Sequence, residues 1–408
     1  MVREYDAALT VPAALIAICV GVSFVCNRST NAYRIWEAAS LSSPPHAISF
    51  GIEALAPHQC CGSWNKDGSV YFFQALVNGF WQIFAQPGNQ GIFVRSSYTA
   101  DQLTTGLVQY SSPVASPDSD RLYVLSQSHK SEVVRYDLAT QQWTPIAEGV
   151  PADTAAFSKD GKSQAFTRMP DHTLWRCSMP GCTSPVQLTF APVRATMPRW
   201  SPNGQKIACM TRTAGGAWQA TLISVAGGPA FHIPAGAGAA DPSWSPEGNR
   251  IAFAAVPGQN QRSAQPIQIY DMGKKETTEI RGAEGYDSPL WSPDGLFLAA
   301  VRSDSRELAF YEFSTGKWRH SPGTRAGYLN WSSDSKRVYF LSPAGDTPAS
   351  VMTVDVATMS KNRVVDLSGI RRPASGFGEW IGLDHSDSPL ALRDLSTEQI
   401  LTWRFERY

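Results

Sequence analysis

The stretches WSPNGQKIACMT (residues 200–211), WSPEGNRIAFAA (residues 244–255) and WSPDGLFLAAVRS (residues 291–303) repeat one phrase. The phrase is Trp-Ser-Pro-Asp-Gly, followed by an apolar run. Five more degraded copies begin at Trp64, Ala115, Phe157, Trp331 and Leu383, and successive copies lie 40 to 52 residues apart. An internal repeat of this length indicates that one structural unit recurs along most of the chain.

Each copy is followed by a short run of apolar and β-branched residues, as a buried strand requires. These runs cover residues 70–73, 121–125, 163–167, 206–210, 250–254, 296–301, 337–341 and 389–392. A second run then follows, for example at residues 132–137, 266–271, 307–313 and 350–356, and a third, more polar run leads to the next copy. With no helical pattern inside the period, the sequence predicts an all-β fold of the β-propeller kind.

The repeated phrase has the composition of a tight turn between two antiparallel strands. Proline presets φ, aspartate can bond its own backbone and glycine supplies a positive φ. The expected structural turn residues are Asp118, Asp160, Asp294 and Asp334. The aromatic residue at the strand end is expected to pack between neighbouring blades. That position holds five of the thirteen tryptophans, namely Trp64, Trp200, Trp244, Trp291 and Trp331.

The end of the chain predicts how the ring closes. The last copy offers strands at residues 376–383, 389–394 and 399–405, one fewer than a blade needs. Residues 46–55 form a β-type run with no blade of its own, so this N-terminal strand is expected to complete the last blade and cover its edge. The expected fold is an eight-bladed β-propeller. Seven blades are the alternative, if the degraded last copy forms no full blade.

The quoted phrases resemble the TolB-type, WD-repeat-like β-propeller repeat of bacterial extracytoplasmic proteins, over roughly residues 46–408. The closing stretch LALRDLSTEQI (residues 390–400) is similar to the end of membrane-anchored propeller proteins of acidobacteria. This resemblance implies an extracytoplasmic sensor or scaffold. It supplies no ligand, because a fold does not decide a function.

The longest apolar run, AALTVPAALIAICVGVSFVC at residues 7–26, carries no charge. A helix of that length rises about 30 Å, one hydrocarbon core. A cleaved signal peptide and a buried soluble helix are the alternatives, although no Ala-x-Ala site closes the run. We expect a tail at residues 1–6, a transmembrane anchor or uncleaved signal at 7–26, a flexible linker at 27–45 and the propeller at 46–408. The propeller is expected on the periplasmic side of a single-pass membrane protein, or secreted if the segment is cleaved.

The charge balance excludes one class of partner. The 35 Lys and Arg residues match 35 Asp and Glu residues, so the formal net charge is zero. A protein that coats nucleic acid or anionic lipid by bulk electrostatics needs an excess of positive charge. No nucleic-acid partner is therefore expected.

Propeller enzymes are the rival hypotheses. A peptidase with a propeller and an α/β-hydrolase domain needs a Gly-x-Ser-x-Gly turn for its nucleophile, and the sequence has none. Residues 136–143 and 312–318 partly match the Trp-docking repeat of quinone-dependent dehydrogenases, but their tryptophan comes too early. The Ser-x-Asp-x-Gly-x-Thr-Trp box of sialidases is also missing. We therefore expect a protein that is not an enzyme, with no catalytic, cofactor-binding or metal-binding residues and no cofactor.

The cysteines give one further expectation. Cys177 and Cys182 flank a Pro-Gly turn between two β-type runs, so they are expected to form a disulfide in an oxidising compartment, with two free thiols as the alternative. His58, Cys60 and Cys61 are the only local cluster of soft metal ligands. Alternation along a strand would point the two cysteines to opposite faces, which favours packing over chelation.

A rigid closed ring with variable loops suits recognition. The expected function is a monomeric, membrane-anchored propeller that binds a protein, a peptide or an envelope polymer as an extracytoplasmic scaffold or sensor. The alternative is a propeller enzyme (hydrolase, lyase or quinone-dependent dehydrogenase) with its active site at the mouth of the central channel. That alternative requires titratable groups that converge there.

Overall fold

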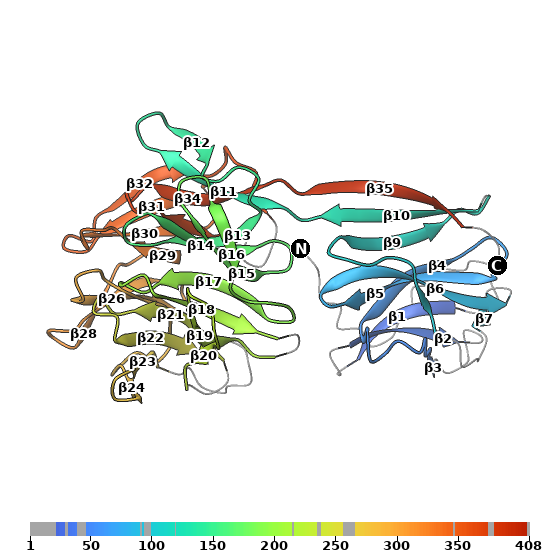
Figure 1. Cartoon of the computed structure of the whole chain (residues 1–408), viewed down its shortest axis with the longest axis horizontal. Helices are drawn as coiled ribbons and strands as arrows, with labels where there is room; N and C mark the ends of the chain where they lie inside the picture. The colour runs from blue at the N-terminus through green and yellow to red at the C-terminus, as the bar shows by residue number, and fades with distance from the viewer. Residues whose placement is uncertain are drawn as a thin grey trace. The chain divides into compact units, whose positions relative to one another are not determined.

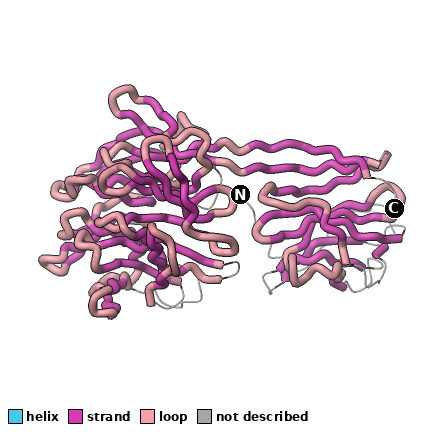
Figure 2. Tube along the Cα trace, in the orientation of Figure 1, coloured by secondary structure: helices cyan, strands magenta, loops and turns pink. Residues whose placement is uncertain are grey.

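The computed structural model describes residues 22–28, 32–38, 46–89, 92–93, 99–118, 120–213, 216–234, 238–255, 266–345, 347–373 and 379–405. These residues form strands and loops, with no helix among them (Figure 2). The chain divides into two compact units. Unit 1 comprises Met1–Ser128 and Glu398–Tyr408, and unit 2 comprises His129–Thr397.

Unit 2 contains six four-stranded antiparallel sheets in its described residues (Figure 1). Five are built from consecutive strands. The first two are β13 (Ala152–Phe157), β14 (Ser163–Arg168), β15 (Thr173–Ser178), β16 (Thr183–Gln187), and β17 (Arg194–Trp200), β18 (Lys206–Arg212), β19 (Gln219–Ser224), β20 (Phe231–His232). The next two are β21 (Ala239–Trp244), β22 (Arg250–Ala255), β23 (Gln268–Asp271), β24 (Glu276–Glu279), and β25 (Tyr286–Trp291), β26 (Phe297–Arg302), β27 (Leu308–Glu312), β28 (Lys317–His320). The fifth is β29 (Gly327–Trp331), β30 (Arg337–Ser342), β31 (Ser350–Asp355), β32 (Lys361–Asp366).

The sixth sheet joins the two ends of unit 2. Strands β12 (Gln142–Pro145) and β11 (Ser131–Asp137) pair with β34 (Pro389–Asp394) and β33 (Ile381–Leu383). Val133 lies opposite Leu392 and Val134 opposite Ala391, and all four side chains are buried. Contacts run from β13 through β17, β21, β25 and β29 to β33, and β33 contacts β13 again. Unit 2 is therefore a closed ring of sheets, a β-propeller.

This arrangement corrects the predicted closure and blade number. The ring of unit 2 has six sheets rather than eight or seven, and β11 rather than residues 46–55 completes its last sheet. Residues 46–55 contain only β3 (His46–Ala47), which pairs with β2 (Ala32–Ala38). The first two copies of the phrase, at Trp64 and Ala115, lie in unit 1 and pair there. Their sequences resemble those of the blades, but their strands are not part of the ring.

The described residues of unit 1 form three sheets. One joins β1 (Val22–Arg28), β2 and β3. Another joins β4 (Gln59–Trp64), β5 (Val70–Val77), β6 (Phe80–Asn89) and β7 (Ile92–Phe93), with β8 (Asp101–Gln102) also paired to β6. The last joins β9 (Gln109–Ala115), β10 (Arg121–Ser128) and the C-terminal β35 (Thr397–Arg404). Phe73 on β5 lies opposite Phe84 on β6, and Phe50 stacks on Phe73 in the buried core of unit 1.

The N-terminal predictions are only partly covered by the structure. Residues 1–21, with most of the predicted anchor, lie outside the described residues, and residues 22–26 belong to strand β1. Part of the predicted flexible linker is also a strand, since residues 32–38 form β2 with Ile35 fully buried. Among the described residues, no helix has the length and apolar character that a membrane span needs.

The strand predictions fare better. All eight runs expected directly after the repeated phrase are strands, namely β5, β10, β14, β18, β22, β26, β30 and β34. Local pattern therefore predicts each strand, whereas the assignment of strands to sheets depends on pairing over long distances.

Candidate functional site

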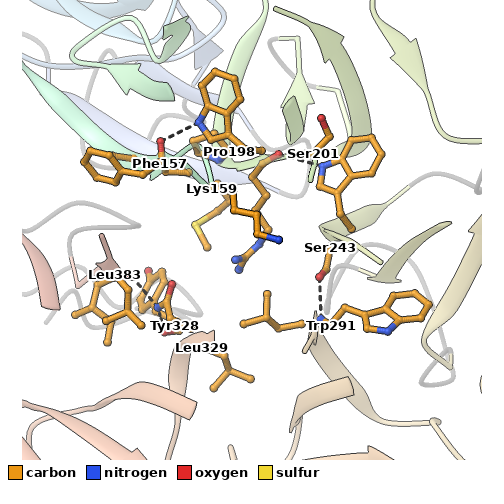
Figure 3. A pocket seen from close by; sticks show the side chains of 18 of the residues that line it. Phe157, Lys159, Pro198, Ser201, Ser243, Trp291, Tyr328, Leu329 and Leu383 are labelled. Atoms are coloured by element: carbon orange, nitrogen blue, oxygen red, sulfur yellow. Dashed lines mark hydrogen bonds between the residues drawn. The ribbon is translucent and has the colours of Figure 1, made fainter. Parts of the chain in front are cut away.

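The first strands of the six sheets surround a cavity of about 290 Å³ in unit 2 (Figure 3). Every one of these inner strands, β13, β17, β21, β25, β29 and β33, contributes to the wall. The exposed wall is mostly polar, with Phe157, Leu290 and Trp380 among its apolar residues. The cavity is the central channel of the ring and is the candidate functional site.

Bulges in the inner strands shape this channel. Four strands bulge three residues before the first residue of the repeated phrase, where Met197, Asp241, Ser288 and Tyr328 have φ between 49° and 53°. A bulge bends its strand and re-aims the side chains that follow. The residues directly before the phrase then line the cavity: Ala156, Arg199, Ser243, Leu290 and Asn330.

The predicted blade tryptophans tie neighbouring inner strands together. The indole N–H groups of Trp200, Trp244 and Trp331 donate to the carbonyls of Ala156 (3.0 Å), Arg199 (3.1 Å) and Leu290 (2.9 Å) respectively. Each acceptor is the residue before the phrase in the preceding sheet. The Nε1 atom of Trp291 is buried without a hydrogen-bond partner among the described residues. Trp64 lies in unit 1, against Tyr71.

The predicted turn aspartates lie on the turns between first and second strands. In Asp160, Asp294 and Asp334, Oδ1 accepts from the serine hydroxyl of the phrase at 2.6 Å and from a backbone N–H two residues later. The Ser158 hydroxyl and the Lys162 N–H lower the pKa of Asp160, and equivalent bonds lower the pKa of Asp334. Asp118 is exposed in unit 1. These carboxylates hold turns and do not line the cavity.

Two cations line the cavity. Lys159 occupies the turn after β13, and Arg199 lies near the end of β17. Neither side chain has a hydrogen bond or an ion pair with another described residue. Burial lowers the pKa of the Arg199 guanidinium, while the Asp241 carboxylate raises it.

A pair of carboxylates lies on the neighbouring inner strands β21 and β25. The Ser288 hydroxyl donates to Asp241 Oδ2 at 2.8 Å, and Arg306 Nη1 donates to both oxygens of Asp287 at 3.1 and 3.2 Å. Burial raises the pKa of Asp287, and the negative charge of Asp241 raises it further. The Arg306 charge and a hydrogen bond from Ser288 act in the opposite direction and lower this pKa. Ser288 therefore contacts carboxylates of two neighbouring inner strands, one of which is paired with Arg306.

A third acidic group lies near this pair. Asp153 Oδ2 is 3.1 Å from His172 Nδ1, whereas Asp153 Oδ1 is buried without a hydrogen-bond partner among the described residues. Burial raises the pKa of Tyr328, and the charges of Asp241 and Asp153 add to the effect. Tyr328, which lines the cavity, therefore lies within electrostatic range of both carboxylates.

The cysteines divide between the two units. Cys177 and Cys182 form a disulfide with Cα atoms 5.0 Å apart in the β15–β16 connection. In unit 1, Cys60 Sγ and Cys61 Sγ lie 2.7 Å apart, because Cys61 has φ 52° in a bulge that breaks the expected alternation. The bond with Cys60 lowers the pKa of Cys61 to about 7. Within the described residues no group of three or more His, Cys, Asp or Glu side chains could hold a metal ion.

None of the charged residues at the channel was selected from the sequence. Arg199 had a signal, because the other seven copies carry an uncharged residue directly before the phrase. Lys159 had none, because the copy at Trp64 carries Lys66 in the same place. The carboxylates had none, because their convergence depends on ring closure.

No protein-family model matches the chain. Among curated proteins, it is 33% identical to dipeptidyl-peptidase 5 of Porphyromonas gingivalis over 121 residues, 26% of the chain and 18% of that protein. It is 28% identical to the uncharacterized peptidase YuxL of Bacillus subtilis over 151 residues, 34% of the chain and 22% of that protein. Each match thus spans about a fifth of the relative's length. Among solved structures, the putative TolB of Agrobacterium tumefaciens matches 66% of the chain and 99% of its own chain, with a TM-score of 0.53 and 18% identity.

These likenesses support one prediction and correct another. The TolB-like β-propeller expected from the repeat is confirmed as a fold. The prediction that the protein is not an enzyme is wrong, because both curated proteins that share its sequence are named peptidases. The absence of a Gly-x-Ser-x-Gly turn argues only against the nucleophilic serine of an α/β-hydrolase domain, and it does not argue against other kinds of enzyme.

Proposed function

We propose that the protein is a propeller hydrolase that binds a peptide in the channel of unit 2 and cleaves it at the channel mouth. The peptidase names of its relatives support the substrate class. The observation that carries the proposal is the Asp241–Ser288–Asp287 arrangement on the inner strands β21 and β25, whose residues Ser243 and Leu290 line the cavity. A closed ring with one polar mouth holds a substrate against fixed groups, which lowers the entropic part of the barrier.

The wall of the cavity binds the peptide. Phe157, Leu290 and Trp380 offer surfaces for apolar substrate side chains, and the bulged inner strands are fixed by the tryptophan hydrogen bonds. These contacts orient the scissile bond and leave the chemistry to Asp241.

Asp241 supplies the base and then the acid. It accepts a proton from water as that water attacks the peptide carbonyl, and it returns this proton to the departing nitrogen. The C–N bond breaks, and the products are a carboxylic acid and an amine. Ser288 positions Asp241 through its 2.8 Å hydrogen bond, and Asp287, held by Arg306, fixes the neighbouring strand.

The test is hydrolysis of a synthetic peptide library by the purified full chain, followed by mass spectrometry. Asp241→Asn is expected to lower kcat about 100-fold or more, since a general acid–base group contributes at least that much, and Asp287→Asn is expected to lower it less. Asp304→Asn is the matched control, because this exposed carboxylate pairs with Arg302 away from the cavity. No cleavage by folded wild-type protein, or equal cleavage by all variants, would overturn the proposal.

We further propose that a monomer of this protein works on the extracytoplasmic side, held by residues 7–26 or secreted after their cleavage. The Cys177–Cys182 disulfide supports an oxidising compartment. The closer resemblance to membrane-anchored propellers of acidobacteria stays a prediction. A reporter fused after Tyr408 tests the location: a reporter that matures only in the periplasm should be active, and activity confined to a cytoplasmic reporter would contradict it.

A further inference from the structure

Lys159 and Arg199 are the two cations whose side chains line the cavity of unit 2. They belong to neighbouring sheets, one in the β13–β14 turn and the other on β17. In Figure 3 Lys159 is drawn among the lining residues, with Pro198 and Ser201 beside it. Two positive charges therefore share one confined volume.

These charges have no direct protein partner. Other arginines of unit 2 are paired: Arg168 with Asp171, Arg302 with Asp304, and Arg306 with Asp287. The side chains of Lys159 and Arg199 make no hydrogen bond or ion pair with any described residue. The interaction of Asp241 with Arg199 is a longer-range electrostatic attraction. Arg199 is half-buried and burial disfavours its charge, whereas Lys159 is exposed. A bound anion would offset the desolvation of Arg199 and add a charge-assisted contact with Lys159.

Arg199 departs from the repeat. The other seven copies carry an uncharged residue directly before the phrase, for example Ala156, Ser243 and Leu290. The Lys159 position is less distinctive, because the copy at Trp64 carries Lys66 in the same place. A charge that the strand pattern does not require, and that faces a cavity, indicates a functional site.

Charge and size select the anion. Lys159, Arg199 and Asp241 together carry one net positive charge, which a single carboxylate neutralises and a phosphate dianion would reverse. The planar guanidinium also matches a carboxylate with two parallel hydrogen bonds. A volume of about 290 Å³ is at the small end of ligand pockets, so it admits one or two residues of a chain rather than a folded partner.

We infer that Lys159 and Arg199 hold a carboxylate of the peptide substrate inside the channel. This inference rests on the proposed function and deepens it, because it makes the enzyme selective for peptides with a free C-terminal or side-chain carboxylate. A C-terminal carboxylate and a side-chain carboxylate have the same chemistry, and the test distinguishes between them.

The test measures fluorescence-anisotropy binding of labelled peptides to the full chain. One pair of peptides differs only in a C-terminal acid or amide, and a second pair, amidated at the C-terminus, differs only in Glu or Gln. Wild-type protein is expected to prefer the acid member of one pair by about tenfold or more, because hydrogen bonds to charged groups are the strong ones. The pair that shows the preference identifies the source of the carboxylate.

Four variants test which residues cause the preference for the acid peptide. Arg199→Gln and Lys159→Pro should each abolish most of the preference for the acid peptide over the amide peptide, and Lys159→Pro introduces the residue that the next three turns carry. Arg199→Lys should keep part of the preference, since it retains the charge but not the planar fork. Lys162→Met is the matched control, because this exposed lysine of the same turn does not line the cavity.

The outcomes separate this inference from the proposed chemistry. Acid-selective binding that depends on Arg199 but leads to no cleavage supports the carboxylate site and overturns the hydrolase. Cleavage of acid and amide peptides alike, by wild type and variants, overturns the carboxylate site alone. Binding of an oligouronate without binding of any peptide overturns this inference, since the carboxylate would then belong to a polysaccharide.

Discussion

The indole hydrogen bonds between sheets lead to a quantitative prediction for the ring. Trp331 and Trp291 occupy the same position in adjacent sheets and are 8% and 5% exposed. The Trp331 N–H donates to the Leu290 carbonyl at 2.9 Å, whereas the buried Trp291 N–H has no partner among the described residues. Replacing either residue by phenylalanine removes the same volume, so the two changes differ mainly in one hydrogen bond.

Trp331→Phe should therefore lower the free energy of unfolding by about 1–3 kcal/mol more than Trp291→Phe. This range is the cost of losing a buried hydrogen bond and leaving its partner group unpaired. The Trp291 ring also lies 4.9 Å from the Arg250 guanidinium. Phenylalanine keeps this cation–π contact in weaker form, so the difference in unfolding free energy between the two variants becomes smaller by about 0.5–1 kcal/mol.

The assay is urea unfolding of the two full-length variants, with the midpoint and slope compared at one temperature. Trp331→Phe is expected to show the lower midpoint with an unchanged slope. The reasoning is refuted if Trp291→Phe is equally destabilised or more so, because the shared loss of ring volume would then dominate and the inter-sheet hydrogen bonds would contribute little.

Two further predictions concern a turn and a titrating group. Gly161→Ala and Gly204→Ala both place a side chain at a positive φ, 69° and 68°, but only at Gly161 would the new Cβ lie 2.7 Å from the His385 ring. Gly161→Ala should show the lower thermal midpoint, and His385→Ala should remove the excess; equal losses would contradict the clash. Burial raises the pKa of Asp287, so the folded state binds more protons than the unfolded state above the ordinary aspartate pKa, and stability should fall as pH rises through that window. Asp287→Asn should flatten this part of the stability–pH curve, and an unaltered slope would argue against the raised pKa.

The strands were predictable because their determinants are local. A run such as Lys206–Arg212 is apolar and β-branched, and the turn before it carries Asn203 and Gly204 with the expected hydrogen bond and positive φ. The disulfide position was predictable for the same reason, since Cys177 and Cys182 flank one short turn. Each of these features depends on a few neighbouring residues.

Pairing over long distances was not predictable in this way. The run at residues 131–137 could extend a blade with its sequence neighbours, but it pairs with residues 389–394, because Val133 and Val134 meet Leu392 and Ala391 in a buried interface. The copies at Trp64 and Ala115 carry a similar phrase and still lie outside the ring. Counting copies therefore overestimated the number of blades.

The sequence by itself determined that this protein is an all-β chain of repeated strands with a TolB-like propeller, because turn chemistry and strand pattern are local properties. Only the tertiary structure decided which strands form the ring and which charges meet inside it. Asp241 and Asp287 are 46 residues apart in the sequence, and Lys159 and Arg199 are 40 apart. Closure of six sheets around one axis brings Lys159 and Arg199 to a single cavity and sets Asp241 and Asp287 on neighbouring inner strands, and no local pattern records that arrangement.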